Sequence, residues 1–125
     1  MASKDDTKKI LFIERDQFYV EVLGAFTRLF LNIAFTIVGN AREAADHISA
    51  KPDLIIVDLD GDPEDALDFV ATRSSDPDTK RIPILGLSKH ASIRDRAIGQ
   101  GCAGFLTKPF KVRELEVLVK KLLEA

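Results

Sequence analysis

Residues 54–57 form an uninterrupted apolar run, Leu-Ile-Ile-Val, and the run ends at the carboxylate of Asp58. A strand without polar positions needs cover on both faces, and such strands occur mainly in parallel sheets that carry helices on each side. The run therefore predicts a central strand of an α/β sheet. An unpaired charge beside a core is unfavourable, so Asp58 either caps the next helix or is retained for chemistry.

The rest of the chain alternates short apolar runs with segments of helical period, which is typical of an α/β fold with a doubly wound parallel sheet. Five β/α units fit the flavodoxin-like architecture, (βα)5, whose strand order is 2-1-3-4-5. The expected strands cover residues 10–13, 35–38, 53–58, 83–87 and 103–107. The expected helices follow them, with core positions at Tyr19, Val22, Leu23, Phe26, Leu29 and Phe30 in the first and at Val112, Leu115, Leu118, Val119 and Leu122 in the fifth.

Three of the expected helices begin with a capping signal. Asn40 is followed three residues later by Glu43, and Ser92 is followed three residues later by Asp95. Asp62 precedes a proline and two acidic residues, which suits the first turn of the third helix. These signals predict where the second, third and fourth helices start.

Length and composition fit one domain without support from disulfides. The chain has 125 residues, of which 46% are apolar, and its 18 basic and 20 acidic residues leave a net charge of −2. This near balance of charge does not predict a broad basic surface that would bind nucleic acid or an anionic membrane. Cys102 is the single cysteine, and no apolar stretch reaches the roughly 18 residues that span a bilayer. We therefore expect a cytoplasmic protein with a disordered polar tail at residues 1–9 and one domain at residues 10–125.

Parallel strands in the order 2-1-3-4-5 bring residues that are distant in the sequence to one edge of the sheet. Ligand sites in such sheets lie at the carboxyl ends of the strands, where the strand order reverses between strands one and three. Residues 14–16, Glu-Arg-Asp, should then lie beside Asp58, with Ser88 and Lys108 arriving from strands four and five. The sequence predicts one polar site built from these residues.

These residues, in this order, resemble the motifs of a response-regulator receiver domain of two-component signalling, and the similarity runs from Ile10 to Leu123. The resemblance implies that Asp58 accepts a phosphoryl group from a histidine kinase or a phosphotransfer protein. It also implies that Ser88 and Lys108 contact the phosphoryl oxygens. Apart from its own phosphorylation and dephosphorylation, such a domain is not an enzyme.

The resemblance assigns roles outside the phosphorylation site as well. Phe105 matches an aromatic switch position on strand five, although it also suits ordinary core packing, and Pro109 matches a proline that follows a cis peptide bond. Switching would change the surface made by helix four, strand five and helix five, where a downstream protein partner docks. No DNA-binding or enzymatic output domain is expected in this chain, so we expect no direct nucleic-acid binding and no membrane partner.

Mg²⁺ is the cofactor that the resemblance implies. This ion prefers oxygen ligands, and the candidates are Glu14, Asp16, Asp58 and the backbone carbonyl of Asp60. Asp16 has a second interpretation, because an aspartate at this position also suits the N-cap of the first helix.

Arg15 departs from the family pattern, which has a metal-binding aspartate at this position. Two unit charges about 4 Å apart interact by roughly 4 kcal/mol at an effective dielectric constant near 20, so an inward guanidinium would repel a divalent ion strongly. Two arrangements stay open. The long stem can carry the guanidinium to solvent and leave a weakened Mg²⁺ site, or Arg15 can pair with Asp58 and make the domain a pseudo-receiver, a phosphorylation-independent interaction module.

Overall fold

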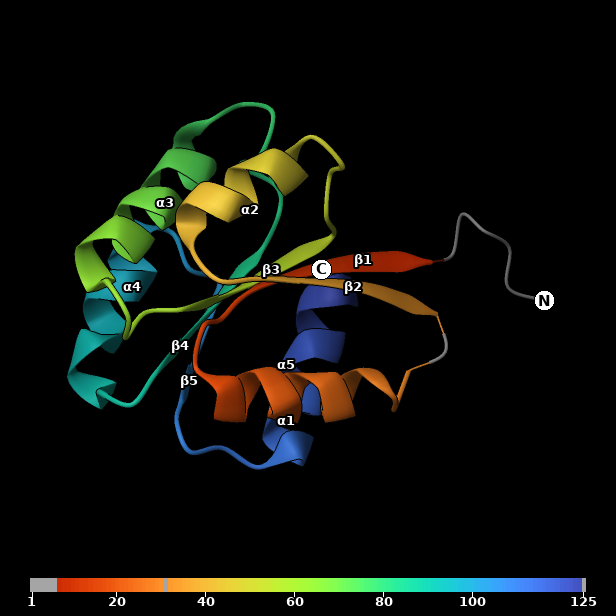
Figure 1. Ribbon diagram of the computed structural model, residues 1–125. Helices are drawn as coiled ribbons and strands as arrows, with labels where there is room; N and C mark the ends of the chain where they lie inside the picture. The colour runs from red at the N-terminus through yellow and green to blue at the C-terminus, as the bar shows by residue number, and fades with distance from the viewer. Residues whose placement is uncertain (1–6, 31, 125) are drawn as a thin grey trace.

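The computed structural model describes residues 7–30 and 32–124, which form a five-stranded parallel sheet between two layers of helices (Figure 1). The strands are β1 (Lys8–Ile13), β2 (Ile33–Val38), β3 (Leu54–Asp58), β4 (Ile84–Ser88) and β5 (Gly104–Thr107). They pair in the order β2-β1-β3-β4-β5. The α/β class, the doubly wound sheet and the strand order predicted from the sequence are therefore confirmed.

The helices divide between the two faces of the sheet (Figure 1). One face carries α1 (Gln17–Thr27) and α5 (Val112–Glu124), and the other carries α2 (Ala41–Ile48), α3 (Pro63–Ser75), a 3-10 turn, η2 (Ala91–Ile93), and α4 (Arg94–Gln100). Among the described residues, no helix is long and apolar enough to cross a membrane.

Each face of the sheet has its own apolar core. Phe12 on β1 and Ile56 on β3 pack toward α1 and α5, whereas Ile55 and Val57 on β3 pack toward α2, α3 and α4. All four side chains are buried. This cover on both sides explains why β3 is apolar without interruption.

The strand register brings the predicted site together. Ile13 of β1 pairs with Val57 of β3. At the same edge Ser88, the last residue of β4, pairs with Thr107, the last residue of β5. The residues that follow these strands therefore leave the sheet side by side, where the strand order reverses between β1 and β3.

β1 begins two residues earlier than predicted, at Lys8. Lys8 and Lys9 pair in register with β2, and the Lys9 amide also donates to the Asp53 carboxylate at 2.8 Å. Both lysines therefore belong to the sheet and not to the polar tail predicted at residues 1–9. Residues 1–6 of that tail lie outside the described residues.

α1 ends at Thr27, so the prediction that the helix continues through Leu29 and Phe30 is wrong. The Thr27 hydroxyl donates to the Gly24 carbonyl at 2.6 Å, and the next amides bond three residues back instead of four. These bonds tighten and close the last turn. Leu29 is consequently 57% exposed, whereas Phe30 still packs against the core on the α1 and α5 face.

The capping box predicted at Ser92 and Asp95 is also wrong. α4 begins at Arg94, directly after η2, and no side chain caps its first turn. An N-cap residue needs an extended backbone. Ser92 lies inside η2, and Ile93, which precedes α4, already has helical torsion angles, so neither can act as a cap.

The other two predicted caps are confirmed. Asn40 accepts a hydrogen bond from the Glu43 amide at 2.9 Å, and Glu43 in return accepts one from the Gly39 amide at 3.0 Å. Asp62 accepts a hydrogen bond from the Asp65 amide at 3.1 Å. These bonds fix the starts of α2 and α3 beside the polar edge of the sheet.

Candidate functional site

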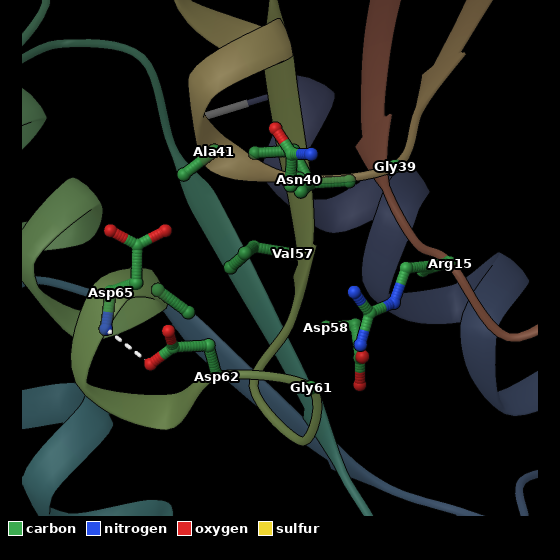
Figure 2. Close-up of a pocket in the computed structure, with 11 residues that line it drawn as sticks. Arg15, Gly39, Asn40, Ala41, Val57, Asp58, Gly61, Asp62 and Asp65 are labelled. Carbon is green, nitrogen blue, oxygen red and sulfur yellow. Dashed lines mark hydrogen bonds between the residues drawn. The ribbon is translucent and has the colours of Figure 1, made fainter.

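A cleft lies at the carboxyl ends of β1, β3, β4 and β5. We call it the Asp58 cleft; it has a volume of 260 Å³ and is lined by Arg15, Asp16, Asp58, Asp60, Gly61, Lys89 and Lys108. A smaller hollow of 60 Å³ lies beside α2 and α3 (Figure 2). Arg15, Asp58 and Gly61 line both spaces.

The predicted site residues come together at this edge, as the topology required. Four of them line the Asp58 cleft, namely Asp16, Asp58, Asp60 and Lys108. Glu14 and Ser88 are buried and bond to residues that line it. Of the two remaining positions, Phe105 lies on β5 among apolar side chains, and Pro109 follows Lys108.

Lys108 is the charged centre of the site. Its ammonium bonds to Glu14 Oε1 at 2.7 Å and to Asp58 Oδ1 at 2.9 Å. The side chains of Lys108 and Glu14 are each 1% exposed, and that of Asp58 is 11% exposed. The ammonium also lies 4.0 Å from the ring centroid of Tyr19. At this burial, the pairing stabilises charges that would otherwise be strongly unfavourable.

Lys108 is the single cation bonded to two carboxylates, those of Glu14 and Asp58, and this arrangement affects the pKa values of Lys108 and Glu14. Burial alone would lower the pKa of Lys108, but its hydrogen bonds to Glu14 and Asp58 outweigh burial and raise the pKa. Burial raises the pKa of Glu14 despite the bond from Lys108, and the charge of Asp58 adds to the rise. The lysine therefore stays charged, and Glu14 takes up a proton more readily than an ordinary glutamate.

Glu14 and Asp16 direct their carboxylates at donors within the chain. Glu14 Oε2 accepts from the amides of Arg15 and Asp16 at 3.2 Å each, and its Oε1 is bonded to the buried lysine. Asp16 Oδ1 accepts from the Phe18 amide at 2.9 Å and caps α1, while Lys89 Nζ lies 4.0 Å from Asp16 Oδ2. The structure confirms the helix cap predicted for Asp16, and its metal role stays a prediction.

Arg15 is exposed, and its guanidinium lies near the loop that follows β3 (Figure 2). A Cβ atom on Gly61 would lie 3.7 Å from Arg15 Nη2 and 3.9 Å from Asp58 Oδ2, so both side chains flank the same small residue. No acidic side chain of the described residues lies within 4.0 Å of the guanidinium nitrogens. The guanidinium thus lines the cleft without pairing directly with Asp58.

Asp60 bonds across the cleft to the end of β4. Its Oδ1 accepts from the Ser88 hydroxyl at 2.6 Å, and its Oδ2 accepts from the Lys89 amide at 2.8 Å. Ser88 is fully buried, and its oxygen accepts from the His90 amide at 2.9 Å. The Asp60 amide donates to Asp58 Oδ1 at 3.2 Å. Asp60 therefore holds the hydroxyl that the resemblance assigns to a phosphoryl group.

The charges that line the Asp58 cleft balance without a metal ion. The lining has three carboxylates and three cations, namely Asp16, Asp58 and Asp60 against Arg15, Lys89 and Lys108. Most carboxylate oxygens of Glu14, Asp16 and Asp58, the side chains predicted as Mg²⁺ ligands, already accept hydrogen bonds from the chain. Within residues 7–30 and 32–124, no three acidic, histidine or cysteine side chains gather so that they could hold a metal ion. To bind in this arrangement, Mg²⁺ would have to displace these hydrogen bonds.

Comparison with known proteins finds relatives among signalling regulators, although no protein-family model matches the chain. Response regulator Rre1 from Synechocystis is 29% identical over 117 residues, and transcriptional regulatory protein PrrA from Mycobacterium leprae is 30% identical over 118 residues. These matches cover 91% and 92% of this chain but 51% and 49% of the two relatives. The chain spans about half the length of the curated relatives it matches.

Solved structures agree with these relatives. The signal receiver domain of a DNA-binding response regulator from Colwellia psychrerythraea has a TM-score of 0.84 and is 26% identical, with 94% of this chain and 99% of that chain covered. The chain is a receiver domain of the response-regulator type. The receiver domain of a sensor histidine kinase from Pseudomonas aeruginosa, which holds a magnesium ion in its active-site cleft, has the same fold, with a TM-score of 0.82, 24% identity and coverage of 95% and 99%.

Phe105 precedes Lys108 by three residues in the chain, and Pro109 follows it directly. Phe105 is partly buried against the core on the α2, α3 and α4 face, and its Cδ1 would lie 3.6 Å from a Cβ atom on Gly86. Its role as a switch stays a prediction, because packing of this kind also suits a plain core residue. The Lys108–Pro109 peptide bond is cis.

The thiol of Cys102 is expected to resist alkylation in the folded receiver. Cys102 is buried, and burial raises its pKa to about 12, so very little of the reactive thiolate exists at neutral or mildly alkaline pH. We expect iodoacetamide to label the folded protein at about pH 8 at least roughly a thousandfold more slowly than the unfolded chain. Mass spectrometry over time, with and without denaturant, measures both rates. Similar rates would show that the thiol is accessible and ionises normally.

Sequence reasoning missed the role of Tyr19 and of the Asp60 side chain. Tyr19 follows a helical period, which indicated only a core position, yet its ring lies against the Lys108 ammonium. Asp60 was considered for its backbone carbonyl, whereas its carboxylate bonds to Ser88, 28 positions away. No local pattern indicates a bond between residues so distant in the sequence.

Proposed function

We propose that this receiver accepts a phosphoryl group on Asp58 from a histidine kinase or a phosphotransfer protein and relays the signal to a protein partner. The observation that carries the proposal is the bond of 2.9 Å between Asp58 Oδ1 and the buried Lys108 ammonium, at the open edge of the sheet. Asp58 Oδ2 lies near Gly61 and accepts no hydrogen bond from the described residues. One oxygen is thus held by a cation, and the other is free to attack phosphorus.

In the proposed step, an Asp58 oxygen bonds to phosphorus while the bond from phosphorus to the donor breaks. With a phosphohistidine donor, the imidazole leaves and takes up a proton from solvent, and Asp58 becomes an acyl phosphate. Negative charge develops on the phosphoryl oxygens during transfer, and fixed cations stabilise it. Lys108 is the cation bonded to Asp58, and Arg15 lines the same cleft.

We expect Mg²⁺ to bind this receiver weakly. The Pseudomonas receiver has a magnesium ion in its cleft, and in this chain Asp16, Asp58 and Asp60 line the cleft and would offer oxygen ligands. The ion would have to compete with the bonds that Glu14 and Asp60 make within the chain and with the positive charge of Arg15. No step of the proposal depends on it.

The proposed output surface is formed by α4, β5 and α5. Val117 on α5 is 57% exposed, and Ile98 on α4 and Val112 on α5 are exposed as well. A groove of 410 Å³ at β5 and α5 is lined by Leu106, Lys111, Arg113, Glu114, Val117 and Leu118. Exposed apolar side chains rimmed by charges suit a protein partner, so we propose that this receiver is cytoplasmic and contacts a downstream protein, without direct contact to nucleic acid or a membrane.

A second candidate function is a phosphorylation-independent interaction module, which two observations favour. The guanidinium of Arg15 lines the cleft where a metal ion would bind. The Ser88 hydroxyl is already bonded to the Asp60 carboxylate at 2.6 Å. Such a pseudo-receiver would present its output surface in one conformation without any phosphoryl group.

Phosphorylation by acetyl phosphate, followed by mass spectrometry of proteolytic fragments, separates the two candidates. The phosphoacceptor function predicts one phosphoryl group on the fragment that contains Asp58, and none in Asp58→Asn. Asp53→Asn is the matched control, because Asp53 precedes the same strand but bonds to the Lys9 amide away from the cleft, and it should be modified like wild type. Modification at another residue, or no modification, would favour the interaction module.

A further inference from the structure

The Asp60 carboxylate occupies a site made of two hydrogen-bond donors. The Ser88 hydroxyl and the Lys89 amide are adjacent groups at the end of β4, and they donate to the two oxygens of this one carboxylate at 2.6 and 2.8 Å. Donors that converge on one anion in this way form an anion-binding site. In this receiver, the anion is a side chain of the domain itself.

The same donors belong to the cleft in which Asp58 would carry its phosphoryl group. Asp60 follows Asp58 by two residues, its amide donates to Asp58 Oδ1 at 3.2 Å, and both carboxylates line the Asp58 cleft. A phosphoryl group on Asp58 adds strong acceptor oxygens and negative charge to this space. The Asp60 carboxylate therefore holds a donor that those oxygens would use, and its own charge repels them.

The Ser88 hydroxyl has no spare proton in this arrangement. A hydroxyl has one proton to donate, which goes to Asp60, and the Ser88 oxygen accepts from the His90 amide. Ser88 is fully buried, so losing the bond to Asp60 would leave a buried polar group without an acceptor. The hydroxyl is consequently released most easily when another anion replaces the carboxylate.

We propose that Asp60 is a built-in ligand of this anion site, which holds the Ser88 hydroxyl before phosphorylation and which a phosphoryl group on Asp58 has to displace. The displacement of Asp60 rests on the proposed function of Asp58. The role of Asp60 as an internal ligand, which its hydrogen bonds to Ser88 and Lys89 carry, does not depend on that function. Asp60 thereby limits how much phosphorylated receiver accumulates. Displacement of Asp60 frees the Ser88 hydroxyl to follow the phosphoryl group.

Amide hydrogen exchange tests the internal ligand without phosphorylation. Lys89 is exposed and its amide donates to Asp60, so Asp60→Ala is expected to speed exchange of the Lys89 amide about tenfold or more. The Lys108 amide, bonded to the Ser88 carbonyl at 2.8 Å, should keep its rate, which separates loss of one bond from loosening of the whole edge. Asp60→Asn retains one acceptor oxygen and should give a smaller effect. An unchanged Lys89 rate in Asp60→Ala would overturn the inference.

Incubation with acetyl phosphate tests the displacement. The ratio of phosphorylated to unphosphorylated receiver at steady state, measured by intact mass, is expected to be about tenfold or more higher in Asp60→Ala than in wild type. An equal or lower ratio in Asp60→Ala would overturn the displacement. If neither protein is phosphorylated while Lys89 exchange responds to Asp60→Ala, the proposed function of Asp58 fails and the internal ligand stands.

Discussion

Lys108→Met is expected to lower the free energy of unfolding by about 3–5 kcal/mol at neutral pH, because it leaves a buried carboxylate without its cation. Lys108 bonds to Glu14 and Asp58, and the side chains of Lys108 and Glu14 are each 1% exposed. Methionine keeps most of the length and packing of the lysine stem beside Tyr19 but has no charge. Chemical denaturation of both proteins measures the difference.

The effect of Lys108→Met is expected to shrink as the pH falls. Burial already raises the pKa of Glu14, and loss of the lysine raises it further. A carboxyl whose pKa is higher in the folded than in the unfolded state binds its proton first in the folded state, so protonation adds stability as the pH falls through the folded-state pKa. The destabilisation should therefore be smaller at about pH 5 than at about pH 7.

Two variants control for general effects of the substitution. Lys111→Met removes an exposed lysine three residues along the chain and should change stability by less than about 0.5 kcal/mol. The double variant with Glu14→Gln and Lys108→Met removes both charges of the buried pair, so it should recover part of the stability that the single variant loses. Equal losses in the single and double variants would contradict the electrostatic explanation.

Arg15→Asp is expected to raise the Mg²⁺ affinity tenfold or more. Arg15 lines the cleft together with Asp58, so its charge opposes a divalent ion there. At about 6 Å in the dielectric constant of water, a unit and a double charge interact by about 1.4 kcal/mol, which corresponds to a tenfold change in affinity. The substitution also adds a carboxylate, which Mg²⁺ prefers as a ligand. Isothermal titration calorimetry measures the dissociation constants of both proteins.

The matched control for this substitution is Arg28→Asp. Arg28 follows the last residue of α1, roughly 17 Å from the start of the helix, and the variant has the same change in net charge. Screening by salt should keep its Mg²⁺ affinity within about twofold of wild type. Arg15→Ala, which removes the cation without adding a ligand, should give an intermediate affinity. Equal affinities of Arg15→Asp and wild type would show that the Arg15 charge does not act on the cleft.

The sequence predicted the fold well because the spacing of apolar residues shows which faces of each strand and helix are buried. The uninterrupted apolar run before Asp58 required helices on both faces of the sheet, and both are present. Helix caps such as Asn40 could be predicted from the sequence because the hydrogen bond links residues only three positions apart. The same rules failed where the local backbone departed from a regular helix, at the early end of α1 after Thr27 and at the 3-10 turn that contains Ser92.

The sequence predicted where the site residues lie in the fold, but not which hydrogen bonds their side chains make. Strand order brought the residues to one edge, but the donor that each carboxylate accepts depends on side-chain torsions and on contacts between distant residues. Lys108 and Glu14, for example, are 94 positions apart, and nothing in the sequence indicated their ion pair. The direction of the Arg15 side chain was open for the same reason, because its long stem reaches either solvent or the cleft.

The most direct test of the central claim, that Asp58 accepts a phosphoryl group, is the intact mass of wild type and Asp58→Asn after incubation with acetyl phosphate and millimolar Mg²⁺. We predict one added phosphoryl group on a fraction of the wild-type molecules and none on the variant. Wild-type protein that stays unmodified throughout the incubation would contradict the account and leave this receiver as an interaction module.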